Sequence, residues 1–133
     1  MGLDNGIIIR EPEAIREDLE KCPTFKWDDI DGKEYQHIAY WRKCWGIRDA
    51  ILSVLRKDHN SCGEHVIEYD DIRPIMRALK PFLGKDYWDE NADSIWEFDE
   101  QVENMVDIYI RLAWLDDYMQ KHKDLKVYFY DSY

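Results

Sequence analysis

A strand pattern stands at each end of this chain of 133 residues, and helical patterns lie between them. Residues 6–10 contain the unbroken β-branched run Ile7–Ile9, and residues 126–130 combine valine with three aromatic side chains. Both compositions are typical of β-strands. The two end strands can pair in one small sheet. The predicted fold class is therefore α+β, with three main helices packed on a small sheet that includes the N- and C-terminal strands.

The three helices are predicted from the 3.6-residue spacing of apolar side chains. The first covers residues 34–57 and carries two apolar rows side by side. The second follows Asp71, a suitable N-cap, with Pro74 in its first turn. The third covers residues 99–122. We also expect a short helix within residues 11–21, a strand at 65–69 and a strand turn at 94–96.

Size and charge narrow the class of protein. A chain of this length, without repeats or linkers, is expected to form a single domain over residues 1–133. Its 29 acidic residues and 18 Lys and Arg residues give a net charge of −11. Such a field repels nucleic acid phosphates, so we expect no direct nucleic-acid partner. The charge suits attraction to a basic partner, and it also serves solubility alone.

The sequence also bears on location. We find no signal leader, and no apolar run comes near the ~18 residues that cross a membrane. The three cysteines, Cys22, Cys44 and Cys62, show no disulfide framework. We therefore expect a cytoplasmic protein of a bacterial host cell, without a membrane partner.

No familiar catalytic motif is present. The chain lacks a Gly-rich phosphate loop, a Gly-x-Ser-x-Gly elbow and a His-Glu-x-x-His helix. His59 and Cys62 stand close together in a predicted loop, but the four histidines lack a recognisable zinc-ligand spacing. We expect no catalytic residue, no metal and no cofactor, and we predict a binding protein rather than an enzyme.

One basic, aromatic segment stands out in this acidic chain. Residues 42–57 hold five basic side chains and one acid. Arginine offers a planar fork to phosphate or carboxylate, and aromatic rings offer stacking surfaces. The segment therefore suits an anionic, ring-bearing ligand such as a nucleotide. The alternative is core packing with local ion pairs. The candidate residues here are Tyr40, Trp41, Arg42, Lys43 and Arg48.

The opposite composition is found in residues 86–110, which hold nine acids and no Lys or Arg. Acidic side chains mixed with aromatic ones can occupy the basic groove of another protein. The alternative is a solvated acidic loop and helix face. The candidate residues for such a contact are Asp86, Trp88, Asp89, Glu90 and Asp93.

Several stretches of the chain resemble a family of hypothetical proteins from tailed phages and prophages. The similar stretches are Met1-Gly2-Leu3-Asp4-Asn5-Gly6, Ala39-Tyr40-Trp41-Arg42-Lys43, Ser94-Ile95-Trp96 and Phe129-Tyr130-Asp131-Ser132-Tyr133. Relatives often have Ala-Asn after the Tyr-Trp-Arg-Lys motif and a His near position 48, where this chain has Cys44, Trp45 and Arg48. The resemblance implies a phage accessory protein and no particular mechanism.

If the end strands pair, these stretches meet at one end of the sheet. The hypothesis is a single pocket that adds Asn5, Trp96, Tyr130, Asp131 and Tyr133 to the basic segment. Its function would be to sequester a nucleotide-like signal ligand, as a counter-defence protein would, in a homo-oligomer. The alternative hypothesis is an acidic inhibitor that masks the basic nucleic-acid-binding surface of a host protein.

Overall fold

The structure is a computed structural model that describes residues 4–25, 34–42, 44–58, 63–83 and 95–132. Side chains are described throughout these ranges except for Asp4, Arg42 and residues 95–104.

Four strands form one antiparallel sheet in the order β2-β1-β4-β3. The two end strands are its central pair, with Asn5 opposite Asp131 and Ile9 opposite Val127. This confirms the predicted α+β class and the predicted pairing of the chain ends. The strands are β1 (Asp4–Arg10), β2 (Tyr35–Arg42), β3 (Gly63–Ile67) and β4 (Val127–Ser132).

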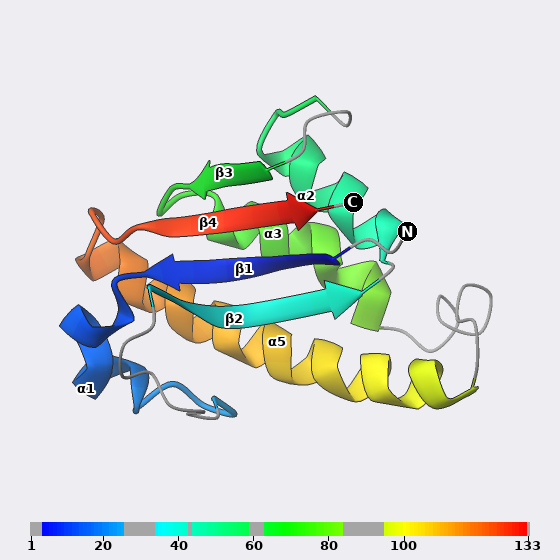
Figure 1. Ribbon diagram of the computed structural model, residues 1–133, viewed down its shortest axis with the longest axis horizontal. Coiled ribbons are helices and arrows are strands. Elements are labelled where there is room, and N and C mark those ends of the chain that lie inside the picture. Colours follow the sequence, from blue (N-terminus) through cyan, green and yellow to red (C-terminus); the bar gives the residue numbers. More distant parts are fainter. Residues whose placement is uncertain (1–3, 26–33, 43, 59–62, 84–94, 133) are drawn as a thin grey trace.

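Three longer helices lie together on one face of the sheet, behind the strands in Figure 1. They are α2 (Trp45–Val54), α3 (Ile72–Leu79) and α5 (Ile95–Lys121). Alternate strand residues such as Ile7, Ile9 and Phe129 point toward these helices and are fully buried in the core. The other face of the sheet carries none of the three helices, and we call it the open face.

Short elements complete the described part of the chain. A 3-10 turn, η1 (Pro12–Ile15), leads into α1 (Arg16–Leu19), which agrees with the short helix expected there. A second 3-10 turn, η2 (Lys80–Leu83), follows α3. No helix in the described ranges has the length and apolar character needed to span a bilayer.

The prediction of one helix over residues 34–57 is wrong for its first part, because residues 35–42 are strand β2. A β-bulge explains the error. Ile7 lies opposite Ala39 but Ile8 lies opposite His37, so Ile38 is an extra residue in β2. A bulge reverses the side-chain alternation at that point. Buried residues then follow one another at Ile38 and Ala39, and the strand loses its period of two.

The other element predictions differ mainly at their bounds. Asp71 is the N-cap residue of α3, although its carboxylate accepts a hydrogen bond from the backbone N–H of Glu68 at 2.8 Å instead of capping the helix. The strand turn expected at 94–96 is wrong for Ile95 and Trp96, which begin α5, while Ser94 lies outside the described residues.

Candidate functional site

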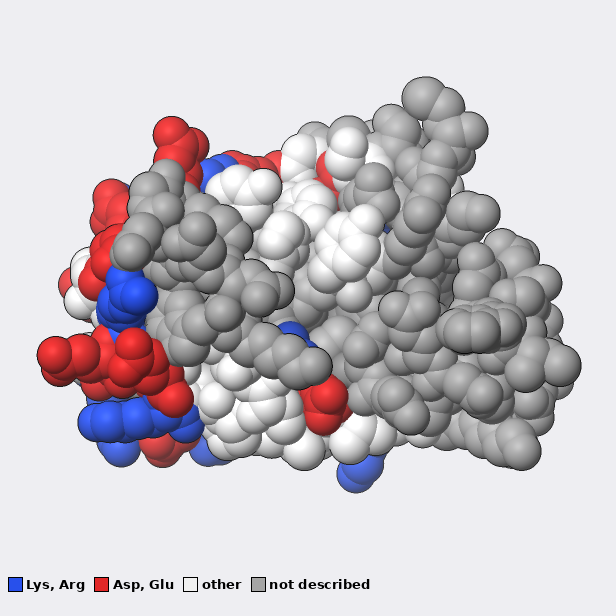
Figure 2. All heavy atoms as spheres, turned by 60° about the horizontal axis from the view of Figure 1, so that its bottom comes forward, with Lys and Arg blue, Asp and Glu red and all other residues white. Residues whose placement is uncertain are grey.

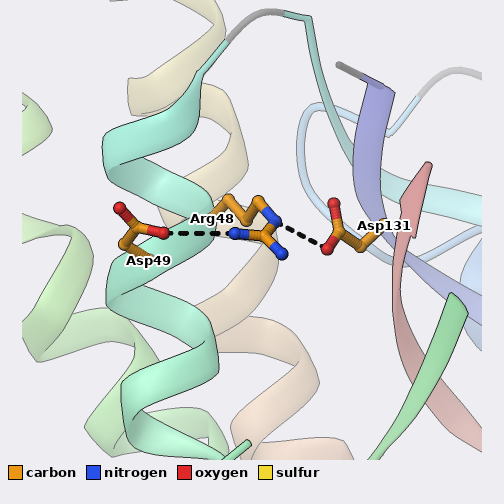
Figure 3. Close-up of polar contacts among 3 residues, drawn as sticks. All are labelled: Arg48, Asp49 and Asp131. Atoms are coloured by element: carbon orange, nitrogen blue, oxygen red, sulfur yellow. Dashed lines mark hydrogen bonds and ion pairs between the residues drawn. The ribbon is translucent and has the colours of Figure 1, made fainter. Parts of the chain in front are cut away.

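Arg48 and Asp131 form a buried ion pair between α2 and the end of β4 (Figure 3). The Nε of Arg48 donates a hydrogen bond to Oδ2 of Asp131 at 2.6 Å, and the two side chains are 3% and 0% exposed. Arg48 also pairs with Asp49, from Nη1 to Oδ1, at 3.3 Å. The Trp45 ring lies 5.5 Å from its guanidinium carbon. The Arg48 charge is therefore compensated within the protein.

Asn5 and His65 add buried polar atoms beside this ion pair. Asn5, in β1, is directly opposite Asp131. On the other side, in β3, His65 lies two pairs further along, opposite Phe129. Three of these buried atoms have no hydrogen-bond partner within the described ranges: Oδ1 and Nδ2 of Asn5 and Nε2 of His65. Burial is the main cause that lowers the pKa of His65 below its ordinary 6.5.

Trp41 belongs to the core rather than to a surface site. It lies opposite Asn5 on the helix-covered face, is fully buried, and donates from Nε1 to the Met105 sulfur of α5 at 3.0 Å. An indole with no exposed surface cannot stack on a ligand, so Trp41 links β2 to α5.

The ten residues of the predicted ligand site thus fall into three groups. Their strands do meet at one end of the sheet, where Asp4 lies between Arg42 and Ser132. The sheet then separates their side chains. Those on the helix-covered face are Asn5, Trp41, Arg48 and Asp131; those on the open face are Tyr40 and Tyr130. Side chains outside the description are Arg42, Lys43, Trp96 and Tyr133.

The five residues predicted for an acidic contact with another protein all lie outside the described residues. They are Asp86, Trp88, Asp89, Glu90 and Asp93.

The open face carries a cluster of rings around His37. The Nε2 of His37 and the Tyr130 hydroxyl are 2.9 Å apart and share a hydrogen bond. Tyr35, Tyr40 and Tyr130 each meet the His37 ring edge-on, with centroids 5.4, 5.7 and 5.4 Å away. Edge-to-face contacts of this kind are favourable.

Gly6 makes this ring arrangement fit. It lies opposite both Tyr40 and Tyr130 in the sheet. A Cβ at this position would stand 2.4 Å from the backbone oxygen of Ala39 and 2.9 Å from Cε1 of Tyr130. Only glycine therefore allows the Tyr130 ring to lie across β1 and reach His37.

Arg10 crosses the open face from the end of β1. Its guanidinium carbon lies 5.5 Å from the Tyr35 ring centroid and 5.8 Å from that of Tyr128, and it pairs with Glu64 of β3. Both distances suit a cation–π contact. Ile8 points to the same face and is only 2% exposed, so the surrounding side chains cover it.

A shallow depression of about 380 Å³ extends across this face. Its size is within the range of small-molecule sites. On β2, Tyr35 and Tyr40 are 43% and 47% exposed; on β3, at the opposite edge of the sheet, Val66 is 52% exposed. The residues lining the depression are Ile8, Tyr35, Gly63, Glu64, Tyr130, Asp131 and Ser132.

Arg10, Tyr35, His37 and Glu64 were missed by the sequence prediction. The signal for Tyr35 and His37 is their alternation with Tyr40 after the bulge, and it emerges only once residues 35–42 are known to be a strand. The predicted helix placed these three rings on different sides. Arg10 and Glu64 carry no local signal of this kind.

The described residues include no cluster suited to a metal ion. Among them, no three His, Cys, Asp or Glu side chains come together as a metal site would require. Burial raises the pKa of the Cys22 thiol to about 11, which keeps that sulfur protonated at neutral pH.

Charged side chains gather at one end of the molecule in Figure 2, at the left, where both signs alternate. Much of the described surface at the centre of the same view is uncharged.

Comparisons with protein-family models, curated proteins and solved structures find no match to this chain.

Proposed function

We propose that this protein acts by non-catalytic binding, with the open face as its contact surface and a basic region of another protein as its partner. The observation that carries the proposal is the pair of exposed tyrosines, Tyr35 and Tyr40, on a face whose depression is lined in part by Glu64. Tyrosines are enriched in protein interfaces and at their energetic centres. A net charge of −11 attracts a basic partner and accelerates encounter with it.

This proposal keeps the acidic inhibitor of the sequence analysis and gives it a different contact surface. If the chain is a phage accessory protein, as its resemblance implies, the partner would be a host protein with a nucleic-acid-binding groove. Masking such a groove requires affinity and no chemistry.

The nucleotide hypothesis stays a prediction with less support. A phosphate needs an available cation. Arg48 pairs with Asp131 and Asp49, and Arg10 pairs with Glu64, so both described arginines near the proposed sites have acidic partners. The hypothesis now depends on Arg42 and Lys43.

Capture from a bacterial lysate tests the contact surface. We expect the wild-type protein to retain a discrete basic protein at low salt and to release it at about 0.5 M salt, because screening weakens exposed charge contacts. The variant Tyr35→Thr/Tyr40→Thr keeps strand-forming residues while removing both exposed rings. It should lose that protein, whereas Val106→Thr, an exposed position on α5, should retain it.

Equal retention by all three proteins would contradict the proposal, because the partner would then bind elsewhere. A thermal-shift series with linear and cyclic nucleotides covers the other hypothesis. A saturable rise in melting temperature with one nucleotide, lost in Arg42→Gln/Lys43→Gln, would favour the nucleotide as the ligand.

A further inference from the structure

The side chain of Arg10 lies against the open face, and its contacts show which groups this face presents to a guanidinium. The guanidinium has two ring neighbours, Tyr35 and Tyr128, and one acidic partner, Glu64. Glu64 comes from β3 and Tyr35 from β2, the two outer strands, so the side chain of Arg10 connects residues across the whole sheet.

Rings and a carboxylate together form a good environment for a guanidinium. The ring faces attract the cation, and the planar fork of arginine matches carboxylate geometry. This environment does not depend on the guanidinium belonging to the same chain. An arginine from outside would find the same rings and the same acid.

The depression of about 380 Å³ gives an external group access to these residues. Its lining includes two of the three Arg10 neighbours, Tyr35 and Glu64. Ile8 and Tyr130 line it between them. The Glu64 side chain remains 42% exposed in its pair with Arg10. An entering cation can therefore reach the carboxylate without unfolding any element.

We infer that this depression binds an arginine side chain of the partner protein, and that Arg10 is an internal competitor for the same carboxylate and rings. The inference rests on the proposed function, since it names the chemical group that the open face recognises. Bound arginine replaces Arg10 on Glu64, and Arg10 moves into solvent.

Titration with hexa-arginine at fixed ionic strength tests this, with hexa-citrulline as the uncharged peptide of the same shape. Glu64→Gln should weaken hexa-arginine binding about threefold, the effect of one exposed ion pair with cation–π support. Glu17→Gln makes the same charge change at an exposed position of α1 and should leave the affinity nearly unchanged.

Removing Arg10, the internal competitor, should raise the affinity for hexa-arginine. Arg10→Met keeps an unbranched apolar side chain without the charge, and it should tighten hexa-arginine binding about threefold. Arg16→Met is the matched control, because Arg16 also pairs with exposed acids, Glu13 and Glu20, and its loss changes the net charge equally.

The inference is overturned if Arg10→Met binds no tighter than Arg16→Met, or if Glu64→Gln behaves as Glu17→Gln does. Equal binding of hexa-citrulline would overturn it as well. These outcomes leave the proposed function standing if Tyr35→Thr/Tyr40→Thr still loses the captured protein. If Tyr35→Thr/Tyr40→Thr instead retains the captured protein, the proposed function fails, because the open face is then not the contact surface.

Discussion

At the scale of single residues, the same basic side chain can hold a fold together or hold a ligand. Arg48 lies in a conspicuous basic segment, yet its partner is Asp131, 83 positions later in the chain. Long-range pairing of this kind leaves no local pattern. The composition near Arg48 therefore indicated a cation available to a ligand, whereas in the fold the charge of Arg48 is balanced by the Asp131 carboxylate.

The Arg48–Asp131 pair is expected to stabilise the junction of α2 with the sheet. Arg48→Met leaves the buried Asp131 carboxylate without this cation and should lower the free energy of unfolding by about 3–5 kcal/mol. Asp131→Asn leaves Arg48 its pair with Asp49 and should lower the free energy of unfolding by less. The double variant Arg48→Met/Asp131→Asn should lose clearly less free energy of unfolding than the sum of the two single variants. Urea denaturation measures all three, and strictly additive losses would show that the residues do not interact.

His65 should make stability depend on pH. Its pKa is lowered in the folded protein, mainly by burial. As pH falls below about 7, the unfolded chain therefore takes up a proton before the folded protein does, and the free energy of unfolding decreases. His65→Phe keeps a ring against Phe129, and it should flatten this decrease between about pH 7 and pH 5. Identical pH profiles for both proteins would refute the assignment.

At the scale of elements, the sequence predicts best where one face of an element is apolar and the other is polar. Helix α3 meets this condition and was predicted at nearly its observed position. Strand β1 was predicted as closely, but from the unbroken run Ile7–Ile9, which covers both faces. Strand β2 offers neither signal, because it has rings on the open face and a bulge at Ile38. Its apolar residues then match a helical spacing by coincidence.

A side chain from α5 secures β2 at this bulge. Nη1 of Arg111 donates to the Ile38 carbonyl at 2.7 Å, and its Nε donates to Oγ1 of Thr24 at 3.1 Å. We predict that Arg111→Met lowers the free energy of unfolding by about 1–3 kcal/mol, because the buried Ile38 carbonyl loses its donor.

Hydrogen exchange supplies the local measurement. The amides of β2 should exchange faster in Arg111→Met, because the strand lies at the sheet edge and loses its link to α5. Arg77→Met removes an exposed arginine from α3 and should change stability by no more than about 0.5 kcal/mol. Unchanged exchange in β2 would show that Arg111 does not hold the strand.

At the scale of the whole molecule, the sequence predicted the sheet that joins both chain ends but not which face would remain uncovered. Asn5, Tyr130 and Asp131 were expected around one pocket because their strands adjoin. Alternation along each strand places Tyr130 on one face and the other two on the opposite face. The bulge in β2 decides which of its rings lie on the open face, and it is defined by the register with β1, a strand distant in sequence.

The binding surface proposed here can be identified from tyrosine ring signals by nuclear magnetic resonance during titration with hexa-arginine. We predict shifts in the rings of the open face, with the helix-side and loop tyrosines Tyr69, Tyr109 and Tyr118 as internal controls. The responding rings should be Tyr35, Tyr40, Tyr128 and Tyr130. Shifts confined to the control rings, or equal in both sets, would contradict a basic partner bound at the open face.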